Sequence, residues 1–91
     1  MSIQALSWAL AQRVGSHTDK HVLIVAASYA RHGDVAPLPT VQKIASCAEM
    51  TERSVMSSLR RLKTKGVLTF SIEQDEDGSD RINLQFGNRE G

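Results

Sequence analysis

Residues 39–66 place two short helical patterns on either side of a tight break, and this arrangement restricts the fold more than any other feature of the chain. In the first pattern, apolar residues recur at spacings of three and four and so share one helix face. These residues are Val41, Ile44, Ala45 and Ala48. Thr40 can cap this helix, because its hydroxyl can accept a hydrogen bond from an unpaired N–H of the first turn.

The pattern breaks at Glu49-Met50, and a second helix is predicted from Thr51 to about Lys65. Thr51 is a second candidate N-cap, and an acidic residue, Glu52, follows it where the helix dipole favours negative charge. Gly66 can take the left-handed conformation that often ends a helix.

On a wheel of ~3.6 residues per turn, this second helix separates into an apolar side and a polar side. The apolar side carries Val55, Leu59 and Leu62. The opposite side and its flanks carry Arg53, Ser54, Ser57, Arg60, Arg61, Lys63 and Thr64. Small residues let a helix enter a DNA groove, and arginines reach base edges or phosphates. An ordinary solvated amphipathic helix is the simpler interpretation of this pattern when it is taken alone.

The break and the helices around it resemble a known family. The spacing of Ile44, Ala45, Ala48, Met50 and Val55 resembles the helix-turn-helix of DNA-binding proteins. The segment L-R-R-L-K-T-K-G-V-L resembles the end of a recognition helix that runs into the first strand of a winged helix. From Ser2 to Phe86 the chain is similar to the winged helix-turn-helix domains of phage and plasmid replication proteins and of related bacterial regulators. The family usually has glycine in the turn where this chain has Glu49, at a cost of roughly 1 kcal/mol.

The resemblance implies a mainly helical α+β fold with a C-terminal β-hairpin, the wing. It also implies sequence-specific binding of double-stranded DNA, in transcriptional regulation or replication initiation, often by a symmetric dimer. Either the first helix or the wing could supply the dimer contact. We expect base contacts first from Arg53, near the start of the recognition helix, and phosphate contacts from the other basic residues. The predicted DNA-binding residues are Thr40, Gln42, Lys43, Thr51, Arg53, Ser54, Ser57, Arg60, Arg61 and Lys63.

Charge along the chain argues partly against DNA. Residues 43–65 contain six basic and two acidic side chains, whereas residues 73–80 contain five acidic side chains and no basic one. A wing that touched DNA would set these carboxylates against a polyanion. The wing tip must therefore point away from DNA or bind something basic, unless the domain is a protein-interaction module. A replication adaptor, or a phage-type inhibitor of a host or nuclease protein, is that alternative, and a net charge of only +1 favours it.

The first part of the chain predicts two more helices. A helix over 2–14 would bury a stripe of apolar residues, with Trp8 covering the edge of the core. The stripe consists of Ile3, Leu6, Leu10 and Val14. Thr18 is the candidate N-cap of the next helix, with Asp19 in its first turn.

The apolar run over 22–27 could be a buried strand or a helix. Because the segment continues to Arg31, with helical spacing up to Tyr29, its length and its alanines favour a helix, and we expect it to be central and largely buried. Two prolines and a glycine predict a loop over 33–39, with Leu38 tucked beneath it. Lys20 and Arg31 are interpreted as ordinary surface charges.

Two alternating segments near the C-terminus predict the hairpin. They are residues 67–72 and 81–86, with Ile82, Leu84 and Phe86 on one face. Asp77-Gly78 is a strong tight-turn signal between them.

Length and composition limit the class of protein. Ninety-one residues suit one domain, over 1–87, with a frayed tail at 88–91. We find no apolar run long enough to span a bilayer and no leader, so we expect a cytoplasmic protein. The sequence has no glycine-rich phosphate loop and no nucleophile–histidine–acid grouping, and we therefore expect neither an enzyme nor a cofactor.

Metal binding is not expected either. His17 and His21 have the spacing of neighbours on a helix, but no cysteine or carboxylate cluster accompanies them. The acidic residues 75–80 lack the offsets of an EF-hand and are interpreted as a solvated turn. The lone cysteine, Cys47, is predicted to be a small buried residue.

Overall fold

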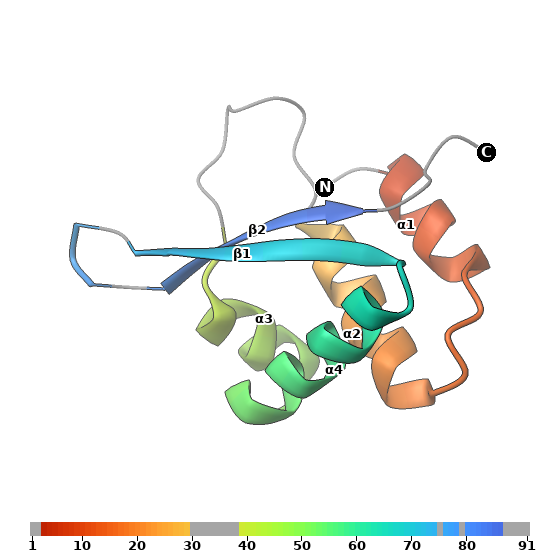
Figure 1. Ribbon diagram of the computed structural model, residues 1–91, viewed down its shortest axis with the longest axis horizontal. Helices are drawn as coiled ribbons and strands as arrows, with labels where there is room; N and C mark the ends of the chain where they lie inside the picture. Colours follow the sequence, from red (N-terminus) through yellow and green to blue (C-terminus); the bar gives the residue numbers. More distant parts are fainter. Residues whose placement is uncertain (1–2, 30–38, 75, 79, 87–91) are drawn as a thin grey trace.

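The computed structural model describes residues 3–29, 39–74, 76–78 and 80–86. Within them the chain forms four helices and then a two-stranded antiparallel hairpin, which confirms the predicted α+β class (Figure 1). The elements are α1 (Ile3–Ala11), α2 (His17–Ser28), α3 (Val41–Ala48), α4 (Glu52–Thr64), β1 (Leu68–Gln74) and β2 (Asp80–Phe86). None of these helices has the length and apolar character needed to cross a bilayer. The predictions for residues 30–38, including the buried Leu38, and for the tail 88–91 lie outside the described residues.

Both predicted caps of α3 and α4 are confirmed. The Thr40 hydroxyl accepts a hydrogen bond from Lys43 N at 3.0 Å, and the Thr51 hydroxyl accepts one from Ser54 N at 3.1 Å. Each bond satisfies one of the backbone donors that a helix leaves unpaired at its start. The sequence boundaries of these two helices were correct because their start signals are local.

Glu49 makes the turn between α3 and α4 in the left-handed conformation, with φ 56° and ψ 46°. Beyond it, Met50 N donates to the Ala45 carbonyl at 3.0 Å, which closes the end of α3 in a Schellman-type motif. The predicted strain at this position is therefore present. At the other end of α4, Gly66 takes the same backbone region, with φ 76°, as expected.

Helix α2 runs through the centre of the fold, and the alternative of a strand is wrong. Five of its apolar residues are buried: Val22, Leu23, Val25, Ala26 and Ala27. The helix begins earlier than predicted, because Ser16 rather than Thr18 is the N-cap and accepts from Asp19 N at 3.3 Å. Asp19 lies in the first turn, as predicted, but it is buried, which the sequence did not predict.

Helix α1 differs most from its prediction, because it ends at Ala11 rather than at Val14. Lys20 Nζ donates to the carbonyls of Leu10 (2.6 Å) and Gln12, and so binds carbonyl groups at the end of α1. Lys20 is therefore a capping residue, and its interpretation as an ordinary surface charge was wrong.

The predicted apolar stripe of α1 is only half correct as a core face. Val14 is buried and Leu6 packs against the core, but the side chains of Ile3 and Leu10 are 79% and 61% exposed. The fully buried residues of the helix are Ala5 and Ala9, and these small side chains let α1 approach α2 closely. Trp8 is half-buried, as expected, and its ring meets Phe86 edge to face at a centroid distance of 5.5 Å.

The hairpin packs one apolar face on the helices. Leu68 pairs with Phe86, Phe70 with Leu84, and Ile72 with Ile82, so all six side chains lie on the same face of the sheet. The predicted inward face of β2 is confirmed, since Ile82 is fully buried and its two neighbours on that face pack against the core. Gly78, with φ 87°, lies in the predicted turn. The strands are slightly longer than predicted.

The two residues before α3 contact the edge of β2 that does not pair with β1. Ile82 N donates to the Pro39 carbonyl at 2.9 Å, and Thr40 forms an isolated bridge with Arg81. In Figure 1 the end of the hairpin that carries the turn extends past α3, away from the other helices. The hairpin is thus fixed to the start of α3 and beside α4.

Candidate functional site

The polar side of α4 lies at the surface of the molecule. The side buried in the core consists of Val55, Ser58, Leu59 and Leu62. On the opposite side Arg53, Ser54 and Arg60 are exposed, and Ser57 is half-buried. The division of α4 into an inner and an outer side therefore follows the predicted one.

The first turn of α4 is held rigidly by two of the predicted site residues. Besides accepting from Ser54 N, the Thr51 hydroxyl donates to Ser54 Oγ at 2.9 Å. Glu52 lies beside them in the first turn, where the helix dipole stabilises its negative charge. This geometry fixes the point from which the exposed side chain of Arg53 extends.

Arg61 is the predicted site residue whose environment differs most from expectation. Its guanidinium donates through Nη2 to Asp19 Oδ1 at 2.8 Å and through Nε to Asp19 Oδ2 at 3.0 Å. Nη2 also donates to the buried Ser58 hydroxyl at 3.1 Å. The Arg61 side chain is still 51% exposed, while that of Asp19 is 1% exposed. The arginine therefore joins α4 to the start of α2, and its charge is already paired.

The two partners shift each other's ionisation. The hydrogen bond from Arg61 lowers the pKa of Asp19 below its ordinary value, against the opposing effect of burial. The same hydrogen bond raises the pKa of Arg61. Lys65 Nζ lies 3.8 Å from Asp19 Oδ2 and also donates to the Val14 carbonyl. Asp19 thus anchors two basic side chains near the end of α4.

Sequence reasoning missed this cluster because its parts are far apart along the chain. Asp19 and Arg61 are separated by 42 residues, and neither position shows its partner in any local pattern. The one available signal was Arg61 itself, on the flank of α4 beside the apolar side.

The remaining candidates on α3 and α4 are polar or basic side chains at the surface. Gln42 and Lys43 are exposed on the first turn of α3, next to the capping residue Thr40. Lys63 is exposed near the end of α4, and its ammonium lies 5.4 Å from the centroid of the Phe70 ring on β1. This cation–π contact places the charge of Lys63 where the helix meets the hairpin.

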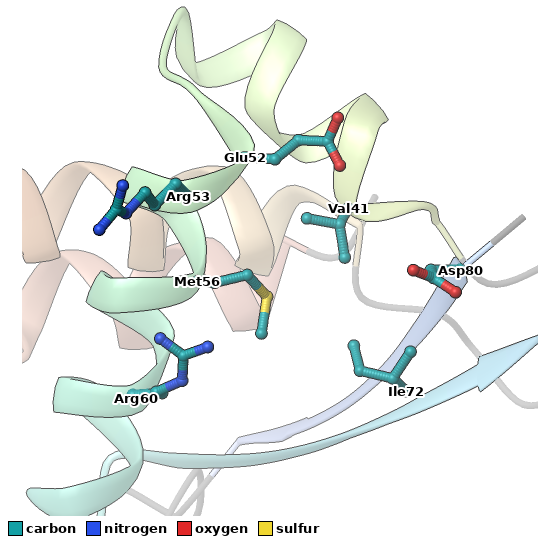
Figure 2. A pocket seen from close by; sticks show the side chains of 7 residues that line it. All are labelled: Val41, Glu52, Arg53, Met56, Arg60, Ile72 and Asp80. Carbon is teal, nitrogen blue, oxygen red and sulfur yellow. The ribbon is translucent and has the colours of Figure 1, made fainter.

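A groove of about 270 Å³ separates α4 from the hairpin (Figure 2). Its apolar walls are Val41, Met56 and Ile72, which point toward its middle. Arg53 and Arg60 border the groove on α4, while Asp80 lies on the hairpin side. Glu52 completes the lining at the end nearest α3. The groove therefore offers both signs of charge around an apolar centre.

Acidic side chains lie along the part of the hairpin that leads to its turn. Glu73, Glu76, Asp77 and Asp80 are all exposed, and Asp75 lies outside the described residues. Glu73 is cross-strand partner to Arg81 and accepts from Asn83 Nδ2 at 3.3 Å. The acidic segment predicted from the sequence is therefore a surface feature of the hairpin.

His21 contacts the backbone of α3, and Cys47 lies at the surface of that helix. His21 Nε2 donates to the Ala48 carbonyl at 3.0 Å, close to the end of α3. Across the described ranges, no three histidine, cysteine or acidic side chains come together as metal ligands. Cys47 is exposed, so its prediction as a buried residue was wrong. Burial, together with the nearby Cys47 thiol, raises the pKa of Tyr29.

No protein-family model matches the chain, and neither curated proteins nor solved structures provide a match.

Proposed function

We propose that this chain is a winged helix-turn-helix domain that binds double-stranded DNA, with α4 as the recognition helix in the major groove. The observation that carries the proposal is the outer side of α4. It presents Arg53, Ser54 and Arg60 to solvent, on a helix whose other side is buried in the core. A helix held in this way can lay its first turns against base edges.

The proposed contacts fall into two groups. Arg53, Ser54 and Ser57 lie on the first two turns of α4 and would read bases. The basic and polar residues around them, exposed except for the half-buried Thr40, would bind the phosphate backbone. These are Thr40, Gln42, Lys43, Thr51, Arg60 and Lys63. Arg61 has a different task in this proposal, because its pairing with Asp19 makes it a positioning residue that sets the angle of α4.

The acidic hairpin limits how DNA can lie. Exposed carboxylates at Glu76 and Asp77 would repel phosphates within about 10 Å at ~0.1 M salt. The proposed DNA therefore runs along α4 and the start of α3, with the turn of the hairpin directed away. The uses we propose are transcriptional control or replication initiation in a phage, plasmid or bacterium, inside the cytoplasm.

Fluorescence anisotropy with labelled duplexes tests the proposal. Affinity for a random duplex should fall steeply with salt, with a log–log slope near −0.9 for each phosphate neutralised. Selection from a pool of random duplexes should yield a preferred site, and Arg53→Ala should lower discrimination there by about 1–3 kcal/mol. Arg13→Ala is the matched control, because it removes the same charge from an exposed position outside α3, α4 and the hairpin. Absence of binding to any duplex at low salt would refute the proposal.

The groove favours a second candidate function, that of a protein-interaction module. An extended protein segment could place an apolar side chain between Met56 and Ile72 and charged side chains beside Arg60 and Asp80. The carboxylates at the groove's edge suit such a segment better than they suit a phosphate backbone. Two results together would support this second function. The protein should bind no duplex, and a protein partner should bind the wild type but not the Ile72→Glu variant.

A further inference from the structure

Strand β1 has an edge that pairs with no other strand within the described residues. Strand β2, by contrast, is covered on both sides, by β1 and by the two residues before α3. Proteins often protect an open strand edge with a proline, a lysine or a bulge. The sequence of β1, LTFSIEQ, has neither proline nor lysine, and its register with β2 contains no bulge. The edge of β1 is therefore able to accept a further strand.

The direction of the backbone groups of β1 follows from one hydrogen bond. Because Ile82 N donates to the Pro39 carbonyl, it points away from β1, so Ile72 and Ile82 are a pair without mutual hydrogen bonds. The N–H and C=O of Ile72 therefore point to the free edge. Since this direction alternates along a strand, the same holds for Phe70 and Gln74. These three residues present a row of backbone donors and acceptors at the edge of β1.

The side chains of the same three residues lie on the inner face of the hairpin, where β1 contacts α4. Ile72 is 42% exposed on this face, and it lines the groove together with Met56 and Arg60 of α4 (Figure 2). Two positions earlier, the ammonium of Lys63 lies 5.4 Å from the centroid of the Phe70 ring. A strand added at this edge would therefore place alternate side chains beside an apolar surface and beside cations.

These charges indicate which kind of molecule fits the edge. Arg60 and Lys63 are both exposed, whereas the inner face of β1 carries no acidic residue. A second copy of β1 would bring no carboxylate to these cations and would bring its own two cations beside them. A phosphate backbone offers no donors to the carbonyls of β1 and no apolar group to Ile72. A protein segment with apolar and acidic residues on one face satisfies all three requirements.

We propose that β1 binds an extended protein segment by strand addition at its free edge. The proposal rests on the second candidate function, the protein-interaction module, and gives that function a mode of binding. In antiparallel pairing, an apolar residue of the segment lies opposite Ile72, and an acidic residue two positions later lies opposite Phe70, near Lys63. The residue just before the apolar one lies opposite Glu73 on the outer face, where a lysine fits.

The probe for this proposal is a synthetic peptide with blocked ends, Thr-Lys-Ile-Thr-Glu-Thr, added to the isotopically labelled 91-residue chain. A short strand binds weakly, so the peptide is used at up to about 1 mM. In NMR spectra the amides of Phe70, Ile72 and Gln74 should shift, and their hydrogen exchange should slow as they form new bonds. The amides of Thr69 and Ser71 already bond to β2 and should keep their exchange rates.

Methylation of the peptide backbone separates strand addition from other kinds of docking. In the proposed pairing, the amides of the peptide's isoleucine and glutamate donate to β1, while the amide of the threonine between them points away. N-methylation of the isoleucine should therefore weaken binding about tenfold or more. N-methylation of the threonine is the matched control and should leave the affinity unchanged.

A charge exchange tests the acidic position of the segment. Lys63→Glu should weaken binding of the peptide several-fold, and a peptide with lysine in place of its glutamate should bind this variant better than the original peptide does. The spectrum of the variant also shows whether it is folded. A variant that binds both peptides equally well contradicts the proposed position.

Three further results would overturn strand addition. One is a spectrum that the peptide leaves unchanged at about 1 mM. Another is binding that survives N-methylation of the isoleucine, which would leave the groove as a protein-binding site, so that the second candidate function would stand without strand addition. The third is protection of the Phe70 amide that rises with protein concentration in the absence of peptide, because a second copy would then occupy the edge. The second candidate function itself is judged separately, by the Ile72→Glu variant.

Discussion

Arg61 holds the buried carboxylate of Asp19 with two of its nitrogens, at 2.8 Å from Nη2 and 3.0 Å from Nε, and so joins the end of α4 to the start of α2. This fork is the geometry in which arginine binds a carboxylate most strongly. A buried carboxylate without such a partner is costly, so the pair constrains where α4 can lie.

Removal of Arg61 should therefore destabilise the fold. We expect Arg61→Ala to lower the free energy of unfolding by about 2–3 kcal/mol, less than for a fully buried pair because the guanidinium is half exposed and Lys65 remains nearby. Urea unfolding followed by Trp8 fluorescence measures this. Arg60→Ala, an exposed neighbour, should change the value by under about 0.5 kcal/mol. Equal effects of the two changes would contradict the pairing.

A double-mutant cycle should show that Asp19 and Arg61 act together. Once Asp19→Asn has removed the buried charge, loss of Arg61 leaves no buried charge unpaired, so the double variant should cost less than the sum of the single ones. A coupling of about 1–2 kcal/mol is expected. Strict additivity would mean that each side chain contributes to stability through other contacts.

Stability should depend on pH through Asp19. Its pKa in the folded chain lies below the ordinary value of 3.8, so the folded form releases this proton more readily than the unfolded form. The stabilisation is complete above that ordinary value and is lost as the pH falls through the lower, folded pKa. The free energy of unfolding of the wild type should thus fall in acid more steeply than that of Asp19→Asn. Identical pH profiles below pH 4 would refute this role.

Glycine at position 49 should stabilise the chain. Glu49 has a φ of 56°, which costs a residue with a Cβ roughly 1 kcal/mol. Glu49→Gly should therefore raise the free energy of unfolding by about 0.5–1 kcal/mol and raise the melting temperature by several degrees. Glu49→Ala keeps the strain and is the control. A loss of stability in the glycine variant would mean that the glutamate side chain makes a stabilising interaction of its own.

The acidic hairpin should weaken nonspecific DNA binding if DNA lies along α4. Glu76→Gln combined with Asp77→Asn removes two exposed negative charges, and the affinity for a random duplex should rise several-fold at low salt. The gain should shrink as salt increases, since screening removes the repulsion. Unchanged or weaker binding would count against a DNA surface near the hairpin.

The parts of the fold set by neighbouring residues were predictable from the sequence. Thr40 and Thr51 cap helices through bonds to residues three positions on, and Gly66 ends α4 by its own backbone freedom. The hairpin was predictable for the same reason, because alternating apolar and polar residues and a tight turn specify it locally. The outer side of α4 also follows from spacing alone.

What depended on distant partners was not predictable. The burial of Asp19 requires an arginine that is 42 residues away. The end of α1 depends on Lys20, which reaches across from α2. The face that α1 buries was misjudged because periodicity marks where large apolar residues lie, whereas α2 packs against the smaller Ala5 and Ala9. Periodicity alone cannot say which of two weakly apolar faces meets a neighbour.

The bond from Ile82 N to the Pro39 carbonyl has a mechanical consequence. It attaches the returning strand to the residue just ahead of α3, so pulling on the hairpin would also pull on the first turn of that helix. A chain cut after residue 66 would lose this tether along with both strands. The hairpin therefore also supports the start of α3, and this structural role does not depend on which molecule binds to the surface beside it.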